Sequence, residues 1–262
     1  MMGKRMQLVF CNIAKRVLAL ILLFGVIIIS LPHSLSVSPD DTTSDTPPLP
    51  FVDVDPADWF YEQVRDVFEK SLMIGTGDVR FTPRGRVTRA MAVQVIYNHR
   101  GQPDVSERSP PPFTDVAEDA WYFDAVTWAW GNSVVRGFGD GTFAPRAYIT
   151  RAHLVVLLNN YAQNMFLGLP QQRDSQPFVD DIDIRNYAKE AIDRFFRAMV
   201  INGRADGRFD PNGNATRAEL ATMLSQFVRY SQRGAPTEPP YGFPEPPGGS
   251  DATPDYGFPY SN

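Results

Sequence analysis

The chain has 262 residues, of which 25 are Lys or Arg and 30 are Asp or Glu. Without residues 1–36, which hold four basic residues and no acid, 21 basic and 30 acidic residues remain, giving a net charge of −9. Such an acidic chain is poorly suited to bind nucleic acid or anionic lipid through bulk charge. Its one cysteine, Cys11, lies in those first 36 residues, so the remainder can form no disulfide and has no cysteine nucleophile.

Residues 1–36 have the pattern of a secretory signal peptide, with a basic start, an apolar run over 17–31 and small residues after it. The apolar run has 15 residues, fewer than the roughly 20 that a spanning helix needs. We therefore predict cleavage near Ser36, and a retained membrane anchor is the alternative. Residues 37–50 are rich in Ser, Thr, Asp and Pro, which predicts a flexible lead-in.

One spacing pattern then occurs three times. Each copy has a Phe-x-Asp landmark, an aromatic residue, a glycine-containing loop and a Thr-Arg-Ala tripeptide. The landmarks begin at Phe51, Phe113 and Phe178; the aromatic residues are Trp59, Trp121 and Tyr187; the loops begin at Gly75, Gly137 and Gly203; and the tripeptides begin at Thr88, Thr150 and Thr216. The pattern predicts three repeats of about sixty residues, over 51–112, 113–177 and 178–233.

Each repeat is predicted to contain two helices, so the fold class is all-α. In the first repeat, apolar residues at helical spacing follow Asp58, which is the expected N-cap. Gly75 and Gly77 are expected to end this helix. The corresponding helices are expected near 121–132 and 187–200, and the second helices from Thr88, over 150–167 and over 216–229.

The second helices carry their own capping residues. Thr88, Thr150 and Thr216 each stand where a side-chain oxygen can accept a hydrogen bond from a free amide of the first turn. Only the third repeat adds Glu219, which completes a capping box with Thr216. The equivalent positions in the first two repeats hold Met91 and His153.

Together, the Phe-x-Asp landmark, the aromatic residue, the Gly-x-x-Asp-Gly-x-Phe-x-Pro loop and the Thr-Arg-Ala-Glu motif resemble the S-layer homology domain, in three copies over residues 51 to about 230. The resemblance implies one pseudo-threefold helical unit with binding clefts between neighbouring repeats. It also implies an exported, non-catalytic module at the cell wall or cell surface. Such modules bind an anionic wall polysaccharide or peptidoglycan-linked polymer, often one with ketal-linked pyruvate, and need no cofactor.

The first-turn arginines are the leading candidates for ligand binding. The N-terminus of a helix favours an anion, and the planar guanidinium group matches a carboxylate in bidentate fashion. The alternative is that each arginine pairs with an acid of the neighbouring repeat, such as Asp78, Asp140 or Asp206. The residues alone leave these two interpretations open, and the resemblance favours binding. The arginines are Arg89, Arg151 and Arg217.

The loops and the aromatic residues are further candidates. Asp140-Gly141 and Asp206-Gly207 are turn sequences whose carboxylates could also contact sugar hydroxyl groups. The first repeat has Val79 in place of the glycine, so its loop should close differently. Trp59 and Trp121 are candidates for stacking on a sugar, although aromatic residues at this position are more often part of the core. The clefts built on Arg151 and Arg217 are expected to bind most strongly.

Other chemistry has little support in the sequence. Asp210, Asn212 and Asn214 alternate as in a calcium loop, but Ala215 and Ala221 replace the glycine and the glutamate that such a loop needs, so no metal site is predicted. A wall-acting glycosidase with paired carboxylates in an inter-repeat cleft is the alternative from another class. Degenerate repeats that bind a protein of the envelope are a third possibility.

The last segment, residues 234–262, is rich in Pro, Gly and Tyr and has four acids but no base. This composition predicts disorder. The segment contains Tyr-Gly-Phe-Pro twice, from Tyr241 and from Tyr256. The doubled motif could be a docking peptide for a protein partner.

Overall fold

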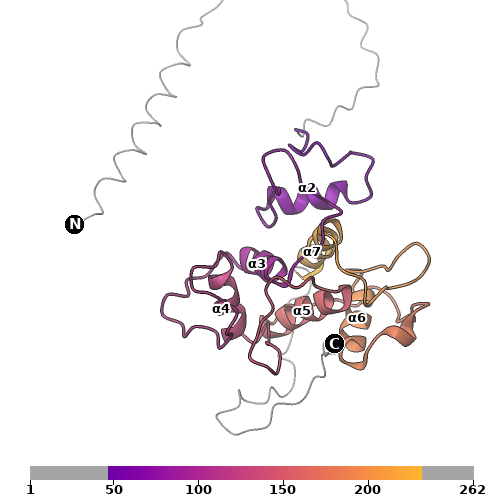
Figure 1. The fold of residues 1–262 in the computed structure, drawn as a ribbon. Coiled ribbons are helices and arrows are strands. Elements are labelled where there is room, and N and C mark those ends of the chain that lie inside the picture. The colour runs from indigo at the N-terminus through magenta and orange to yellow at the C-terminus, as the bar shows by residue number, and fades with distance from the viewer. Residues whose placement is uncertain (1–46, 232–262) are drawn as a thin grey trace, which may run out of the picture. The chain divides into compact units, whose positions relative to one another are not determined.

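The computed structural model describes residues 47–231. This part of the chain contains six α-helices, one short 3-10 helix and no β-strand (Figure 1). The helices are α2 (Tyr61–Glu69), α3 (Arg89–His99), α4 (Phe123–Gly131), α5 (Arg151–Asn164), α6 (Asn186–Arg197) and α7 (Arg217–Ser231), with the 3-10 helix η1 (Asp181–Asp183) before α6. The all-α prediction is confirmed.

The predicted signal peptide, most of the predicted lead-in and the predicted C-terminal tail lie outside the described residues. Within residues 47–231, no helix is both long enough and apolar enough to span a bilayer.

The second helices begin where their threonines cap them. The Oγ1 atoms of Thr88 and Thr150 each accept a hydrogen bond at 3.3 Å from the amide three residues later. Thr216 accepts from the amide of Glu219 at 3.3 Å, and Glu219 Oε2 accepts from the amide of Thr216 at 2.8 Å. This reciprocal pair is a capping box, which satisfies two amides that the helix itself leaves without partners.

Two expectations about the first helix were wrong. Asp58 does not cap α2, which begins at Tyr61; its carboxylate instead accepts a hydrogen bond from the amide of Asp55 at 2.8 Å. The helix ends at Glu69 and is followed by Ser71 with φ of 56°, so a serine and not a glycine takes the left-handed conformation. Gly75 has another role, because a Cβ atom there would lie 2.9 Å from the ring of Phe51.

The Phe-x-Asp landmark holds the loop of its own repeat. In the first repeat, the Asp53 carboxylate accepts from the amides of Phe81 at 2.8 Å and Thr82 at 2.9 Å, while the rings of Phe51 and Phe81 lie 5.4 Å apart. The other repeats reproduce this arrangement with their own residues. Two backbone amides on each carboxylate therefore fix the loop that leads into the second helix.

The helices pair between repeats. The first helix of each repeat packs against the second helix of another: α4 against α3, α6 against α5, and α2 against α7 (Figure 1). The last pairing joins the third repeat to the first. The order of contacts is therefore cyclic, which is the pseudo-threefold arrangement that the resemblance implies.

A hydrogen-bonded triangle lies at the centre of this cycle. The amide of Val87 donates to Ala215 O, that of Ala215 to Ile149 O and that of Ile149 to Val87 O, each at 2.9 Å. Further along the three second helices, His99, Tyr161 and Phe227 occupy equivalent positions, and their rings are 5.6, 6.2 and 5.8 Å apart. Each repeat thus contributes one residue to the triangle and one residue to the group of three rings.

Candidate functional site

The arginine of each Thr-Arg-Ala tripeptide lies at a junction between two repeats. Its Nε donates to the carbonyl oxygen of the loop phenylalanine in the next repeat, and its guanidinium group lies over the ring of that phenylalanine. Arg89 reaches Phe143 at 2.8 Å, Arg151 reaches Phe209 at 2.8 Å, and Arg217 reaches Phe81 at 2.7 Å. All three arginines therefore link the repeats through a backbone carbonyl, and Arg151 also pairs with an acid of the neighbouring repeat, Glu219, as one alternative expected.

The three junctions differ in how much of the guanidinium group remains accessible. Arg151 and Arg217 are only 4% and 7% exposed, and burial lowers the pKa of both. Arg151 Nη1 also pairs with Glu219 Oε1 at 2.6 Å, and Arg217 Nη2 donates to Ile74 O at 2.6 Å. Arg89 is half-buried, and its second hydrogen bond, from Nη2 to Arg136 O, is long at 3.4 Å.

His153 lies at the junction of Arg89 and connects it to the third repeat. Its Nδ1 is 2.8 Å from Thr150 Oγ1, and its Nε2 is 3.0 Å from the hydroxyl of Tyr187, whose ring stacks on the imidazole at 5.3 Å. Burial, together with the positive charges of Arg89 and Arg185, lowers the pKa of His153 to about 4. Two arginines from different repeats thus act on the same imidazole.

The equivalent position at the next junction holds Glu219 in place of His153. There the carboxylate neutralises Arg151 and is also 3.4 Å from Arg204, which pairs with Asp210 at 2.7 Å. The first junction therefore has a neutral imidazole at the position where the second has a carboxylate paired with its arginine. The sequence contained the necessary clue in the change from Glu to His, but the site formed with Arg185 and Tyr187 was not predicted.

Trp59 and Trp121 lie at the surface. They are 65% and 63% exposed, and each makes an edge contact with the aromatic residue that follows it. The expectation that they belong to the core was wrong, because the residues after them, Phe60 and Tyr122, are the buried ones. Tyr187 is half-buried against His153.

The loop aspartates form turns. Asp140 accepts from the amide and the hydroxyl of Thr142, and these hydrogen bonds lower its pKa. Asp206 accepts from the amide of Arg208 at 3.1 Å. Gly141 and Gly207 have φ of 81° and 79°, a conformation that Val79 in the first repeat does not share.

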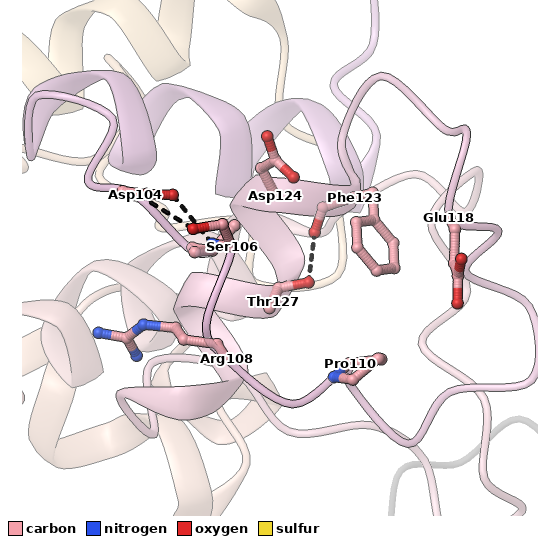
Figure 2. A pocket seen from close by; sticks show the side chains of 9 residues that line it. Asp104, Ser106, Arg108, Pro110, Glu118, Phe123, Asp124 and Thr127 are labelled. Carbon is pink, nitrogen blue, oxygen red and sulfur yellow. Dashed lines mark hydrogen bonds between the residues drawn. The ribbon is translucent and has the colours of Figure 1, made fainter.

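A cavity of about 310 Å³ lies between the linker after the first repeat and α4 (Figure 2). The side chains of Asp104, Glu118 and Asp124 surround it together with the ring of Phe123. Hydrogen bonds from Ser106 lower the pKa of Asp104. A catalytic acid for glycoside cleavage needs a raised pKa, so Asp104 does not suit that role.

Among residues 47–231, no group of three or more His, Cys, Asp and Glu side chains is placed to hold a metal ion. In the stretch that alternates like a calcium loop, the Asp210 carboxylate pairs with Arg204.

The repeats match a known family. The family model for the S-layer homology domain matches residues 50–92, 112–155 and 178–221, which together make up half of the chain. The chain belongs to the S-layer homology domain family. Each match starts at a Phe-x-Asp landmark or one residue before it and ends within a second helix, so each S-layer homology copy spans one inter-repeat arginine.

Several curated proteins resemble this S-layer homology chain. It is 28% identical over 217 residues to the endoglucanase of Bacillus sp. (strain KSM-635). The aligned region covers 82% of this chain and 22% of the endoglucanase. It is 32% identical over 121 residues to the S-layer protein sap of Bacillus anthracis, covering 46% and 14% of the two chains. With the cellulosome-anchoring protein of Acetivibrio thermocellus it shares 26% identity over 151 residues, 56% and 33% of the two chains. The chain therefore spans a third or less of each of these relatives.

Proposed function

We propose that the three repeats form a non-catalytic anchor that binds an anionic wall polysaccharide. The endoglucanase, the S-layer protein and the cellulosome-anchoring protein differ in name and share only part of their length with this chain. A region common to such different proteins fits a shared role in attachment better than a shared reaction. As a member of the S-layer homology family, the chain is an exported protein of the cell surface or cell wall.

The observation that carries this proposal is the neutral imidazole at the first junction, in the place where the second junction has a carboxylate paired with its arginine. Arg89 is half-buried over two phenylalanine rings, with Arg185 exposed nearby and with His153 neutral between them. A guanidinium group that is held in place and partly shielded from water binds a carboxylate more strongly than a mobile surface arginine does. An acidic sugar, such as one with ketal-linked pyruvate, has this carboxylate.

The proposal reverses the ranking of the clefts that the sequence suggested. The guanidinium groups of Arg151 and Arg217 are buried and hydrogen-bonded within the protein. We therefore assign recognition of the charge to Arg89, and contact with neighbouring sugar units to the exposed rings of Trp59 and Trp121. These rings suit the role because an aromatic ring offers a sugar an apolar face at little cost in entropy. Asp140 and Asp206, with Gly141 and Gly207, contribute by shaping the loops.

Sedimentation with bacterial walls tests the anchor. The purified protein should sediment with intact walls and lose this binding once the non-peptidoglycan polymer is removed. Arg185→Gln should weaken binding several-fold, and the double change with Arg89→Gln at least tenfold. Arg100→Gln with Arg229→Gln is the matched control, because it removes the same charge from exposed positions at the C-terminal ends of α3 and α7.

Each other outcome points to a different function. Equal binding to stripped walls would contradict the polysaccharide and favour peptidoglycan or a protein of the envelope. Release of soluble sugar during incubation would support the glycosidase alternative. A protein partner for residues 234–262 remains part of the proposal. Deleting that segment tests whether its role is separate from the wall site, because wall binding should then be unchanged.

A further inference from the structure

Three segments meet around the hydrogen-bonded triangle of Val87, Ile149 and Ala215, and each begins with a turn and ends in residues that form backbone bridges. They are residues 83–88, 145–150 and 211–216, with the sequences Pro-Arg-Gly-Arg-Val-Thr, Pro-Arg-Ala-Tyr-Ile-Thr and Pro-Asn-Gly-Asn-Ala-Thr. Backbone bridges join each segment to its neighbours. The triangle residues themselves are buried, whereas Arg86 and Tyr148, each just before a triangle residue, are exposed, and Asn214 is half-buried.

These outward side chains form what we call the apical face. Five of its members are exposed and one is half-buried. The apical face consists of Arg84, Arg86, Arg146, Tyr148, Asn212 and Asn214. The guanidinium group of Arg86 lies over the ring of Tyr148 at 5.3 Å, so side chains from the first and second repeats meet there.

The charge of the apical face is opposite to that of the chain. Its three segments contain three arginines and no acid, whereas the chain beyond residue 36 has a net charge of −9. Within residues 47–231, none of these three arginines forms an ion pair with a carboxylate. The face is therefore a local region of positive potential, built on a rigid hydrogen-bonded frame.

We propose that the apical face is a second binding site, separate from the junction of Arg89, and that it takes an acidic saccharide. The arginines supply planar donors for carboxylate or phosphate oxygens. The Tyr148 ring, which is 50% exposed, supplies an apolar surface for a sugar ring. The amides of Asn212 and Asn214 supply donors and acceptors for sugar hydroxyl groups.

The composition of the face distinguishes a saccharide from a lipid surface. Membrane-binding patches combine many basic residues with protruding apolar side chains. The most exposed apolar residues of residues 47–231, Ile182, Val179 and Val52, all lie outside the three apical segments. The amides of Asn212 and Asn214 suit hydroxyl groups instead, and the ring of Tyr148 beside Arg86 suits a sugar ring.

This inference rests on the proposed function only in taking the wall polymer as the natural ligand. A polymer that contacts both the junction of Arg89 and the apical face gains affinity because the second contact is intramolecular. The apical site can be tested with a defined acidic polysaccharide. The outcome of that test is then independent of wall binding.

Binding of the purified protein to polygalacturonate is the direct test, with neutral dextran as the reference. We expect binding to polygalacturonate that weakens with salt, and a loss of at least tenfold in the triple variant R84Q/R86Q/R146Q. The matched control R100Q/R108Q/R229Q removes the same charge from exposed positions elsewhere and should change binding less than twofold. Thermal melting of both variants should match the parent, because all six positions are exposed.

A second measurement separates a saccharide from other polyanions. Tyr148→Ala should weaken binding of polygalacturonate several-fold and leave binding of polyphosphate unchanged. The inference fails if the triple variant binds polygalacturonate as the parent does, or if the parent does not bind it. It also fails if Tyr148→Ala has no effect, or if vesicles of phosphatidylglycerol bind in its place. Wall binding that is lost in R89Q/R185Q but kept in the triple variant upholds the anchor and rejects the apical site.

Discussion

Arg89 and Arg151 occupy equivalent positions and make the same hydrogen bond to a loop phenylalanine, yet their surroundings differ. Arg151 is buried and paired with Glu219, whereas Arg89 is half-buried beside a neutral His153. One arginine is therefore enclosed with a carboxylate, and the other stays partly accessible beside a neutral ring. The same motif can thus have different surroundings in neighbouring repeats, and the binding role proposed for Arg89 depends on that difference.

Removal of the two arginines should separate their roles most clearly. Arg151→Ala leaves Glu219 and the Phe209 carbonyl without their partner in a buried site, which should lower the free energy of unfolding by about 3–5 kcal/mol. Arg89→Ala should cost about 1–2 kcal/mol, because solvent can replace the lost hydrogen bond. Urea denaturation measures both. Equal losses for the two variants would remove the distinction between the junctions.

The stability of the first junction should depend on pH. The pKa of His153 in the folded protein, about 4, is below the ordinary value of 6.5, so the unfolded chain binds the proton more readily. The stabilisation is complete above about pH 6.5 and is lost as the pH falls toward 4, by up to about 3 kcal/mol. His153→Gln should remove most of this loss. The part that remains is expected from His99, whose pKa is also lowered by burial.

Conversion of one junction into the other tests the comparison directly. His153→Glu places a carboxylate beside Arg89, as Glu219 lies beside Arg151. We expect wall binding to weaken by about tenfold, equivalent to about 1.4 kcal/mol, without loss of stability, since the new side chain can also cap α5. Co-sedimentation and urea denaturation of the same variant give the two values. Unchanged binding would show that Arg89 does not recognise the charge of the ligand.

The smallest effect is expected at the contact of Tyr187. Tyr187→Phe removes the hydrogen bond to His153 and keeps the stacked ring, which should lower the free energy of unfolding by about 1 kcal/mol. The titration of His153, followed by NMR, should shift toward its ordinary pKa if solvent enters the junction. A variant as stable as the parent, with the same titration, would show that this contact does not hold His153 in place.

Local signals in the sequence were sufficient for the starts of the second helices but not for the ends of the first helix or for the partners of the helices. Thr88, Thr150 and Thr216 predicted where the second helices begin, because capping depends on residues within one turn. No local signal indicates that α2 packs on α7, because this contact depends on how all three repeats close into a cycle.

The site was harder to predict for a related reason. The motif pointed to the arginines, whose ligand binding stays a prediction, but their hydrogen bonds across the repeats go to carbonyl groups, which every residue has and no motif reveals. Trp59 was expected in the core because aromatic residues usually pack there, and the buried position belongs to Phe60 beside it. A shift of one residue at the start of a helix moves a side chain from the core to solvent.

The cyclic order of the repeats also affects how the chain can fold. Arg217 donates to the carbonyl of Phe81 across 136 positions, and α2 has its main helix partner in α7. The last repeat thus completes the first one. When the chain is synthesised from its N-terminus, the cycle of repeats cannot close until α7 is available. Such a high contact order predicts slow folding, with exposed apolar surface until the ring closes. Proteolysis during refolding should therefore be fastest in chains truncated before residue 217.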